Sequence, residues 1–408
     1  MMQEIQAAPE QVAHGQRLSI TRQDILLLLL VLVFATLPLA PAPAGVAVAL
    51  LMSYWLFSGI CWSERRLWLS QDWFVPAMFL FVLPWVGLLW SPDVATGLKD
   101  AERSIYWIYG LAAATVSYRR YAPRMLVFGF LAGLLVNVLV SVLQYLQLLP
   151  MYKGPGYGFL NHITYSLLLV AGMLFLAYLY REQKKWLVRL IILGGMFLLG
   201  WNLAIGVSRA GYLAFILAMP WMLSVMFSRR QIVWIVLSCL LATGALASSS
   251  VVRSRMAEIR QDVQEYKHGH GATSVGLRFH MWVGALKIWK AHPVFGVGTG
   301  GYRQALKKVV SPEYAIFTHP HNSVLYMAAS YGAVGVLVFG WFVYVVLRRG
   351  WRTRATVTGR IILVLFFVIG VGSITDTQIM GHATGALLGF IGGLATGSLE
   401  TDDESGDN

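Results

Sequence analysis

Charged residues are scarce in this sequence of 408 residues. Only 12% of the side chains are charged, whereas 57% are hydrophobic, and a soluble globular chain carries about 25% charged residues. This scarcity excludes an ordinary soluble enzyme, and we expect no nucleic-acid partner. Long apolar stretches recur along the chain, many of them near the length of about 20 residues that crosses a bilayer. The composition therefore predicts a protein surrounded mainly by membrane lipids.

Cysteine is almost absent as well. Cys61 and Cys239 both fall at or inside apolar stretches, where a free cysteine behaves as a small hydrophobic residue. This placement argues against a disulfide framework and against a metal site built on cysteine. We therefore expect no metal and no cofactor.

The apolar stretches predict an all-α polytopic membrane protein of about 12 transmembrane helices. We expect spans at 24–40, 43–61, 73–90, 104–118, 125–147, 163–180, 186–206, 210–228, 231–249, 322–347, 360–380 and 382–398. Four regions follow from them. Residues 1–249 hold the first nine helices, 250–321 form one large helical loop, 322–398 hold the last three helices, and 399–408 form an acidic tail.

The basic residues predict which side of the membrane each loop occupies. With both termini in the cytoplasm, the cytoplasmic segments hold 18 of the 32 Lys and Arg residues, and the short outer loops hold four. This is the asymmetry expected of cytoplasmic loops. The other ten lie between Arg253 and Lys308, in a loop long enough to cross regardless of charge. The 250–321 loop and any site on it are therefore expected outside the cytoplasm.

Four large apolar side chains recur at helical spacing in this loop, with basic residues beside them. They are Phe279, Trp282, Leu286 and Trp289, next to Lys287 and Lys290. Such a basic amphipathic helix would lie along the membrane surface. A stripe that faces the protein core is the alternative.

Two arginines near the outer ends of the spans are candidates for binding phosphate. Arg209 occupies a turn of two or three residues in the sequence Ser-Arg-Ala-Gly at 208–211, and Arg278 lies in the long loop. A guanidinium can donate two parallel hydrogen bonds to phosphate oxygens. The alternative for Arg209 is an interfacial arginine that extends to lipid headgroups.

A glycine-rich run, Gly-Val-Gly-Thr-Gly-Gly-Tyr at 296–302, follows His292 and Pro293. Its spacing fits neither the dinucleotide-binding pattern nor the P-loop pattern. Two interpretations remain open: a tight turn packed against helix ends, or a backbone cradle for a lipid pyrophosphate.

His321 is the candidate general base. Pro320 precedes it and a span follows it, so the imidazole is expected at the start of a helix, and a neutral imidazole can accept a proton near pH 7. A hydrogen-bonded structural histidine is the alternative. A zinc site with His319 is disfavoured, because two histidines separated by one proline, with no cysteine nearby, make a poor zinc-binding set.

Further polar residues lie near the outer ends of the spans. Asn161, His162 and Asn322 are candidates for substrate binding, as is His319, while the sequence leaves open whether Asp376 reaches the site. For Asp100 and Glu102, salt bridges with the flanking Lys99 and Arg103 are favoured over binding of a divalent metal.

These motifs resemble those of the O-antigen ligases of Gram-negative bacteria, in the wider group that includes O-antigen polymerases and protein O-oligosaccharyltransferases. The resemblance rests on the turn at 208–211, the glycine run at 296–302, His321 and Asn322 followed by Gly332 and Gly335, and the twelve-span layout with one large outer loop. The motifs cover about residues 200–340. The earlier spans match only in their general character.

The resemblance implies an all-helical membrane glycosyltransferase of the GT-C-like type in the bacterial inner membrane. Its reaction would transfer O-antigen from undecaprenyl pyrophosphate to lipid A-core at a periplasmic site, by an inverting displacement without a metal. The family's base would fall on His321, and its pyrophosphate-binding residues on Arg209 and Arg278. Membrane lipids and the two lipid substrates would be the only partners. The loop's surplus of six positive charges would attract both anionic substrates.

Two alternatives remain. An O-antigen polymerase uses the same donor, and Arg260 with Gly271 fits one of the arginine-x10-glycine segments by which polymerases are described. A flippase or transporter for lipid-linked oligosaccharides is the alternative from a different class. Transporters commonly carry internal repeats and ionisable residues at the bilayer midplane, whereas the ionisable residues here lie at span ends.

Overall fold

The computed structural model describes residues 20–117, 119, 121–151, 158–206, 208–228, 230, 231, 233, 274–311 and 317–398. The described residues are helical, with no β-strand among them. The expected ninth span at 231–249 lies outside the described residues except for residues 231 and 233. The whole segment at 250–273, which includes Arg260 and Gly271, and the acidic tail at 399–408 also lie outside them. The all-helical prediction is confirmed for the described part of the chain.

The described residues of the first half of the chain form nine helices and two short 3₁₀ segments. They are α1 (Arg22–Thr36), α2 (Pro41–Phe57), α3 (Ile60–Ser63), α4 (Arg65–Leu69), α5 (Phe74–Val86), η1 (Gly87–Trp90), α6 (Val94–Glu102), η2 (Arg103–Ile108), α7 (Tyr109–Ala114), α8 (Ala122–Tyr145) and α9 (His162–Glu182). The second half contains α10 (Trp186–Ile205), α11 (Arg209–Met226), α14 (Ser274–Ala291), α15 (Tyr302–Leu306), α16 (Ser323–Arg352), α17 (Val357–Thr375), η4 (Gln378–Met380), α18 (His382–Leu394) and η5 (Ala395–Ser398).

Six of these helices are long and apolar enough to cross a membrane. They are α8, α9, α10, α11, α16 and α17, while α2, α18 and the segment formed by α5 and η1 are shorter apolar helices. The expected fourth span at 104–118 is built from η2 and α7, continuing from α6. The chain is a membrane protein with at least these six candidate spans, and the count of twelve stays a prediction.

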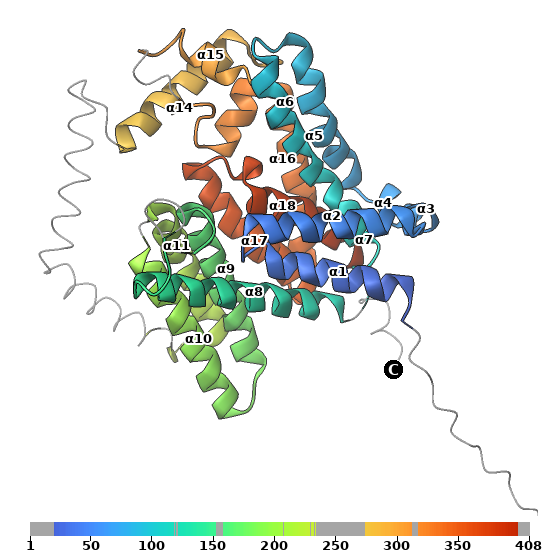
Figure 1. The fold of residues 1–408 in the computed structure, drawn as a ribbon, viewed down its shortest axis with the longest axis vertical. Coiled ribbons are helices and arrows are strands. Elements are labelled where there is room, and N and C mark those ends of the chain that lie inside the picture. Colours follow the sequence, from blue (N-terminus) through green and yellow to red (C-terminus); the bar gives the residue numbers. More distant parts are fainter. Residues whose placement is uncertain are drawn as a thin grey trace, which may run out of the picture.

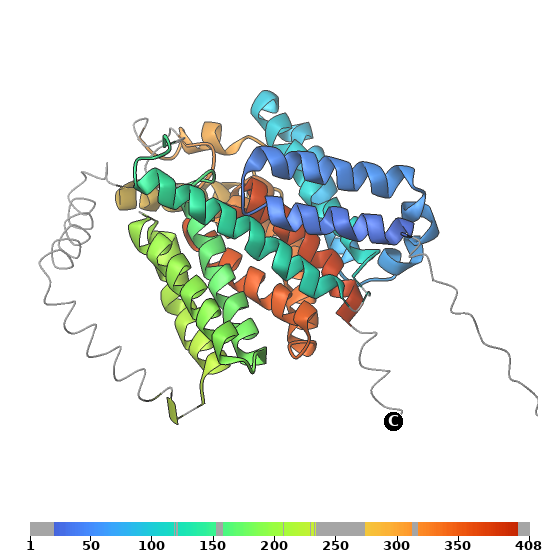
Figure 2. The same ribbon diagram turned by 60° about the horizontal axis from the view of Figure 1, so that its bottom comes forward.

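Glycines allow several of the helices to pack at very short distances. A Cβ on Gly133 of α8 would lie 1.6 Å from the carbonyl oxygen of Ala35, and one on Gly393 of α18 would lie 1.9 Å from the carbonyl oxygen of Gly110. Small residues at such crossings are typical of membrane helices, whose backbones can then approach closely. Figure 2 shows the result for α8, which lies against α1 on one side and against α9 and α10 on the other.

Helix α16 is kinked at Gly332, and the kink holds the glycine run in place. Gly332 has φ 63° and ψ −151°, and a Cβ there would lie 2.4 Å from the backbone of Val294. The irregular backbone finds partners in the loop, because the amides of Val297 and Gly298 donate to carbonyls of α16 and the amide of Ala333 donates to Pro293. In Figure 1, α14 and α15 accordingly lie with α5 and α6 at one end of the molecule, next to α16.

The glycine run is a tight turn. The amides of Gly296, Val297, Gly298, Thr299 and Gly301 all donate to backbone carbonyls of the protein, at 2.9 to 3.2 Å. Since these amides already have acceptors, they cannot form a phosphate cradle without breaking the turn. The alternative of a backbone cradle for pyrophosphate at these amides is therefore wrong.

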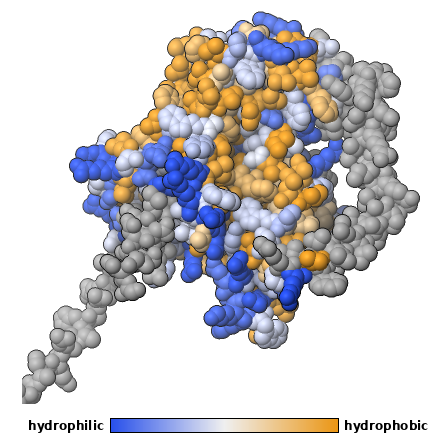
Figure 3. Space-filling view, turned by 180° about the vertical axis from the view of Figure 1, so that it is seen from behind, coloured by the Kyte–Doolittle hydropathy of each residue, from blue (hydrophilic) through white to orange (hydrophobic). Residues whose placement is uncertain are grey.

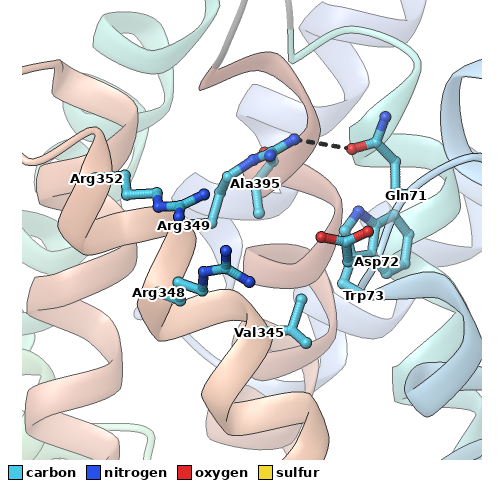
Figure 4. Close-up of a pocket in the computed structure, with 8 residues that line it drawn as sticks. All are labelled: Gln71, Asp72, Trp73, Val345, Arg348, Arg349, Arg352 and Ala395. Carbon is cyan, nitrogen blue, oxygen red and sulfur yellow. Dashed lines mark hydrogen bonds between the residues drawn. The ribbon is translucent and has the colours of Figure 1, made fainter.

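The far end of α16 carries an arginine cluster. Figure 4 shows Arg348, Arg349 and Arg352 around a pocket that also contains Asp72 and Gln71. Arg349 donates to the side chain of Gln71 at 3.1 Å and, through Nε, to the carbonyl of Ala395 at 3.0 Å. Because α16 is kinked at Gly332, a rise of 1.5 Å per residue sets an upper limit of roughly 45 Å between this cluster and the end next to His321.

Large hydrophobic side chains remain exposed on the surface. Phe57 is 85% exposed and Phe197 is 76% exposed, together with many leucines, isoleucines and valines. Hydrophobic groups cover much of the face seen in Figure 3, with hydrophilic groups gathered toward its margins. Contiguous apolar surface of this kind marks a membrane-contacting surface.

Candidate active site

His321 and Asp376 form a hydrogen-bonded pair between the start of α16 and the end of α17. The imidazole Nδ1 lies 2.8 Å from the carboxylate Oδ1, and the side chains are 24% and 19% exposed. Helices α16 and α17 follow each other in the sequence, and the short turn between them makes them antiparallel. This arrangement brings together two residues that are 55 positions apart. The structure thereby answers the question that the sequence left open for Asp376.

The backbone around His321 holds its side chain in one place. Its φ is 49°, in the left-handed region that residues other than glycine seldom occupy. Asn322 follows as the N-cap of α16, accepting from the amide of Leu325 at 2.9 Å and donating to the carbonyl of Ile374 at 3.1 Å. Backbone strain of this kind is found at functional sites, where it helps to preorganise the reacting group.

Asp376 is an ionised carboxylate. Burial raises the pKa of Asp376, but the hydrogen bond and charge of His321 and the amide of Thr377 lower it more, so that the pKa lies below its ordinary value. An ionised carboxylate only accepts hydrogen bonds. In the neutral imidazole of His321, Nδ1 therefore carries the proton, and Nε2 is left with a lone pair that can accept one.

His319 lies directly beside this pair. The centroids of the two imidazole rings are 4.4 Å apart, and Nδ1 of His319 lies 3.2 Å from the hydroxyl of Thr377. Burial, reinforced by the neighbouring His321, lowers the pKa of His319 to about 4. His319 is consequently neutral at pH 7 and adds no charge to the site.

The Ser-Arg-Ala-Gly turn places Arg209 at the first position of α11. Ser208 caps the helix by accepting from the amide of Gly211 at 3.3 Å, and its hydroxyl also lies 2.7 Å from that of Ser166 in α9. Gly211 sits against the same serine, since a Cβ there would lie 2.3 Å from the Cβ of Ser166. Ser208 and Gly211 thus anchor the turn, while Arg209 is exposed.

Arg278 joins the site from α14. Burial lowers the pKa of Arg278; the carboxylate of Asp376 opposes this shift by attraction, and Arg209 adds to it by repulsion. The two arginines and Asp376 are therefore close enough for their charges to interact. Because the guanidinium remains charged at pH 7, this part of the site is strongly positive.

Packing around α14 fixes its orientation. Its buried side chains are Met281, Ala285 and Ile288, and the hydroxyl of Tyr302 donates to the carbonyl of Met281 at 2.9 Å. The expected apolar stripe is not this face: Phe279 is 36% exposed and Leu286 is 42% exposed. The alternative of a core-facing stripe is therefore wrong for these two side chains, whereas Trp282 and Trp289 are half-buried. The two exposed side chains suit a membrane surface.

Among the four secondary candidates, the side chains of the two histidines interact with the pair formed by His321 and Asp376. His162 begins α9 and interacts electrostatically with Arg278 and Asp376. Asn161 caps the same helix, accepting from the amide of Thr164 at 2.8 Å. The side chains of Asn161 and Asn322 both serve as helix caps, so their observed role is to position the histidines next to them.

His319, His321 and Asp376 also form a set of potential metal ligands. One ligand atom from each lies within 4.8 Å of the others, and sets of two histidines and a carboxylate hold catalytic zinc in some hydrolases. The sequence expectation considered only the two histidines, because the contribution of Asp376 depends on the fold. The absence of a metal requirement therefore stays a prediction with its own test.

Comparison with known proteins supplies a family for this part of the chain. Residues 194–340 match the model of a family described as O-antigen ligase. A search of curated proteins gave no match. The matched segment contains Arg209, Arg278, the glycine run and His321, whereas Asp376 and His162 lie outside it. This part of the chain is similar to O-antigen ligases.

Proposed function

We propose that this protein is an O-antigen ligase that transfers O-antigen from undecaprenyl pyrophosphate to lipid A-core. The observation that carries this proposal is the pairing of His321 with an ionised Asp376, within electrostatic reach of Arg278 and near Arg209. A base beside a cluster of fixed positive charge is what a sugar transfer from a lipid pyrophosphate requires.

The reaction follows from the geometry of the base. Nε2 of His321 takes the proton from the acceptor hydroxyl while that oxygen attacks the anomeric carbon of the donor sugar. The new glycosidic bond forms as the bond between this carbon and the pyrophosphate oxygen breaks, and the electron pair leaves with undecaprenyl pyrophosphate. The displacement inverts the anomeric configuration. Asp376 stabilises the imidazolium that results.

Arg209 and Arg278 act on the leaving group. The pyrophosphate gains negative charge as the glycosidic bond breaks, and preorganised donors aimed at developing charge are usually the largest single contribution to catalysis. Both arginines lie near helix ends, on α11 and α14, where the membrane-bound donor can present its headgroup. The exposed Phe279 and Leu286 of α14 would keep this helix at the membrane surface beside the donor lipid.

The proposed location is the bacterial inner membrane, with both termini in the cytoplasm and the site facing the periplasm. In support, the arginine cluster of Figure 4 lies at the end of α16 opposite His321, and basic residues accumulate on cytoplasmic loops. The twelve-helix layout and the GT-C-like architecture are part of the same proposal.

A reconstituted assay tests the proposed reaction. Purified protein in nanodiscs is given undecaprenyl pyrophosphate carrying O-antigen, with lipid A-core in one reaction and without it in another. We expect ligated lipopolysaccharide only when lipid A-core is present. Joining of donor repeats to one another would instead indicate a polymerase, and movement of lipid across vesicles without a new glycosidic bond would indicate a flippase.

Replacing Asp376 by Asn should lower turnover on the order of 10²-fold, because the imidazole remains but loses its ionised partner. The amide keeps the size of the side chain, so the protein should fold. We also expect the acidic limb of the pH-rate profile to move to lower pH, since the imidazolium is no longer stabilised by an anion. A lower rate with an unshifted profile would assign Asp376 a purely structural role.

Chelation tests the expectation that no metal takes part. The protein is incubated with EDTA, desalted, assayed for transfer and measured for bound zinc and other divalent metals by elemental analysis. We expect the transfer rate to be unchanged. If activity is lost and zinc restores it, His319, His321 and Asp376 are a set of metal ligands and not a base with its neighbours.

A further inference from the structure

A cavity lies next to the candidate active site. It is bounded by α5, α6, η2, α16 and η4 and is partly open to solvent. Most of its wall is apolar, and the polar groups that reach it include the side chains of Asp100, Arg103, Tyr326 and Tyr331. A mainly apolar wall with a few convergent polar groups is typical of a small-molecule site.

The cavity is lined by residues that lie close in the sequence to His321 and Asp376, although neither of these two residues lines it. Ile379 and Met380 line it only three and four residues after Asp376, and Tyr326 lines it five residues after His321. The charge of Arg103 also contributes to lowering the pKa of His319. A molecule in the cavity would therefore lie near the pair formed by His321 and Asp376.

The charge in this cavity differs from that of the arginine side of the site. The Asp100 side chain is only 10% exposed, and its Oδ1 lies 3.5 Å from Nη1 of Arg103, which is 45% exposed. Burial raises the pKa of Asp100 to about 6, although Arg103 opposes the shift. The salt bridge expected from the sequence is confirmed, but it leaves a largely buried carboxylate that can accept further hydrogen bonds.

We propose that this cavity is the subsite for the acceptor sugar, in which Asp100 accepts hydrogen bonds from sugar hydroxyls and Arg103 binds an anionic group on the acceptor. This inference rests on the proposed function. A carboxylate in the wall repels a pyrophosphate, whereas Arg209 and Arg278 attract one. The donor headgroup and the acceptor sugar thus take different sides of the site.

Steady-state kinetics of Asp100→Asn test the subsite. The amide has the same shape but loses the charge, so we expect the KM for lipid A-core to rise about tenfold while the KM for the donor is unchanged. Glu102→Gln is the matched control: it removes a carboxylate from an exposed position two residues away on the same helix, and both KM values should stay at the wild-type level.

Thermal unfolding separates a binding role from a structural one. The folded protein holds the pKa of Asp100 above its ordinary value of 3.8. The wild type therefore loses stability as the pH rises from 3.8 to about 6. The amide does not titrate. Asp100→Asn should therefore melt at a higher temperature than the wild type above pH 6, whereas removal of a structural ion pair would lower the melting temperature.

Two kinetic outcomes would overturn the proposal: an unchanged KM for lipid A-core, or an equal rise in the KM of both substrates. If the wild type forms no glycosidic bond at all, the proposed function fails, and the subsite is tested by equilibrium binding of lipid A-core alone. Weaker binding to Asp100→Asn than to Glu102→Gln supports the subsite, and equal binding refutes it.

Discussion

His321→Ala should abolish the transfer of O-antigen, with a fall in turnover of about 10³-fold, because general base catalysis contributes about 10²- to 10⁴-fold. A loss of 10³-fold corresponds to about 4 kcal/mol of transition-state stabilisation. The variant keeps the Asn322 cap of α16 and removes no side chain that packs between helices within the bilayer, so it should still insert. The measurement is the single-turnover rate of ligated product in nanodiscs, with the donor in excess.

A second histidine provides the control for this variant. His292 is exposed and lies on the same side of the molecule, just before the glycine run. His292→Ala should transfer O-antigen at the wild-type rate. Donor binding by His321→Ala, measured separately, should also be normal, since the pyrophosphate contacts belong to the arginines. Robust transfer by a correctly inserted His321→Ala protein would remove this residue as the base.

Arg209→Lys should reduce turnover about 10²-fold, even though the positive charge is kept. A lysine ammonium is a point charge and cannot donate the two parallel hydrogen bonds that a guanidinium offers to phosphate oxygens. Removal of one such donor from the developing charge of a transition state costs about 10²- to 10³-fold in kcat. Ser208 and Gly211 anchor the turn independently of this side chain, so the variant should fold normally.

Arg303→Lys is the matched control for this substitution. Arg303 is exposed on α15 and lies near Asp93, away from the pair formed by His321 and Asp376, so transfer should continue at the wild-type rate. The two variants are compared for kcat and for the affinity of undecaprenyl pyrophosphate, which should fall only in Arg209→Lys. Near-normal kcat in Arg209→Lys would leave this arginine as an interfacial residue that binds lipid headgroups.

Some features of the site follow from local sequence. A serine before an arginine, with glycine two positions later, is a helix start, and the short turn leaves Arg209 at the membrane boundary. Asn322 before the apolar stretch of α16 is a helix cap, which puts His321 at the start of that helix. These residues act through neighbours within three or four positions, so periodicity and capping rules predicted them.

The glycine run shows where local rules stop. Its composition suits a turn and an anion cradle equally, and the choice depends on where its amides donate. They donate to carbonyls of α16 and of Gly87, and these acceptors are available because Gly332 breaks the regular hydrogen bonding of α16. The acceptor carbonyls lie more than 30 residues away on α16 and more than 200 residues away at Gly87. The motif alone therefore could not distinguish a turn from an anion cradle.

Local sequence alone predicted a helical membrane protein, the approximate positions of its long helices, and His321 and Arg209 as the residues to test. Periodic apolar stretches and caps encode these features locally. Only the tertiary structure decided that Asp376 orients the imidazole, that Arg278 joins Arg209, and that Asp100 and Arg103 line a cavity beside them. Those residues come from different helices, and their roles arise from charge and hydrogen bonding across helix contacts that no local pattern records.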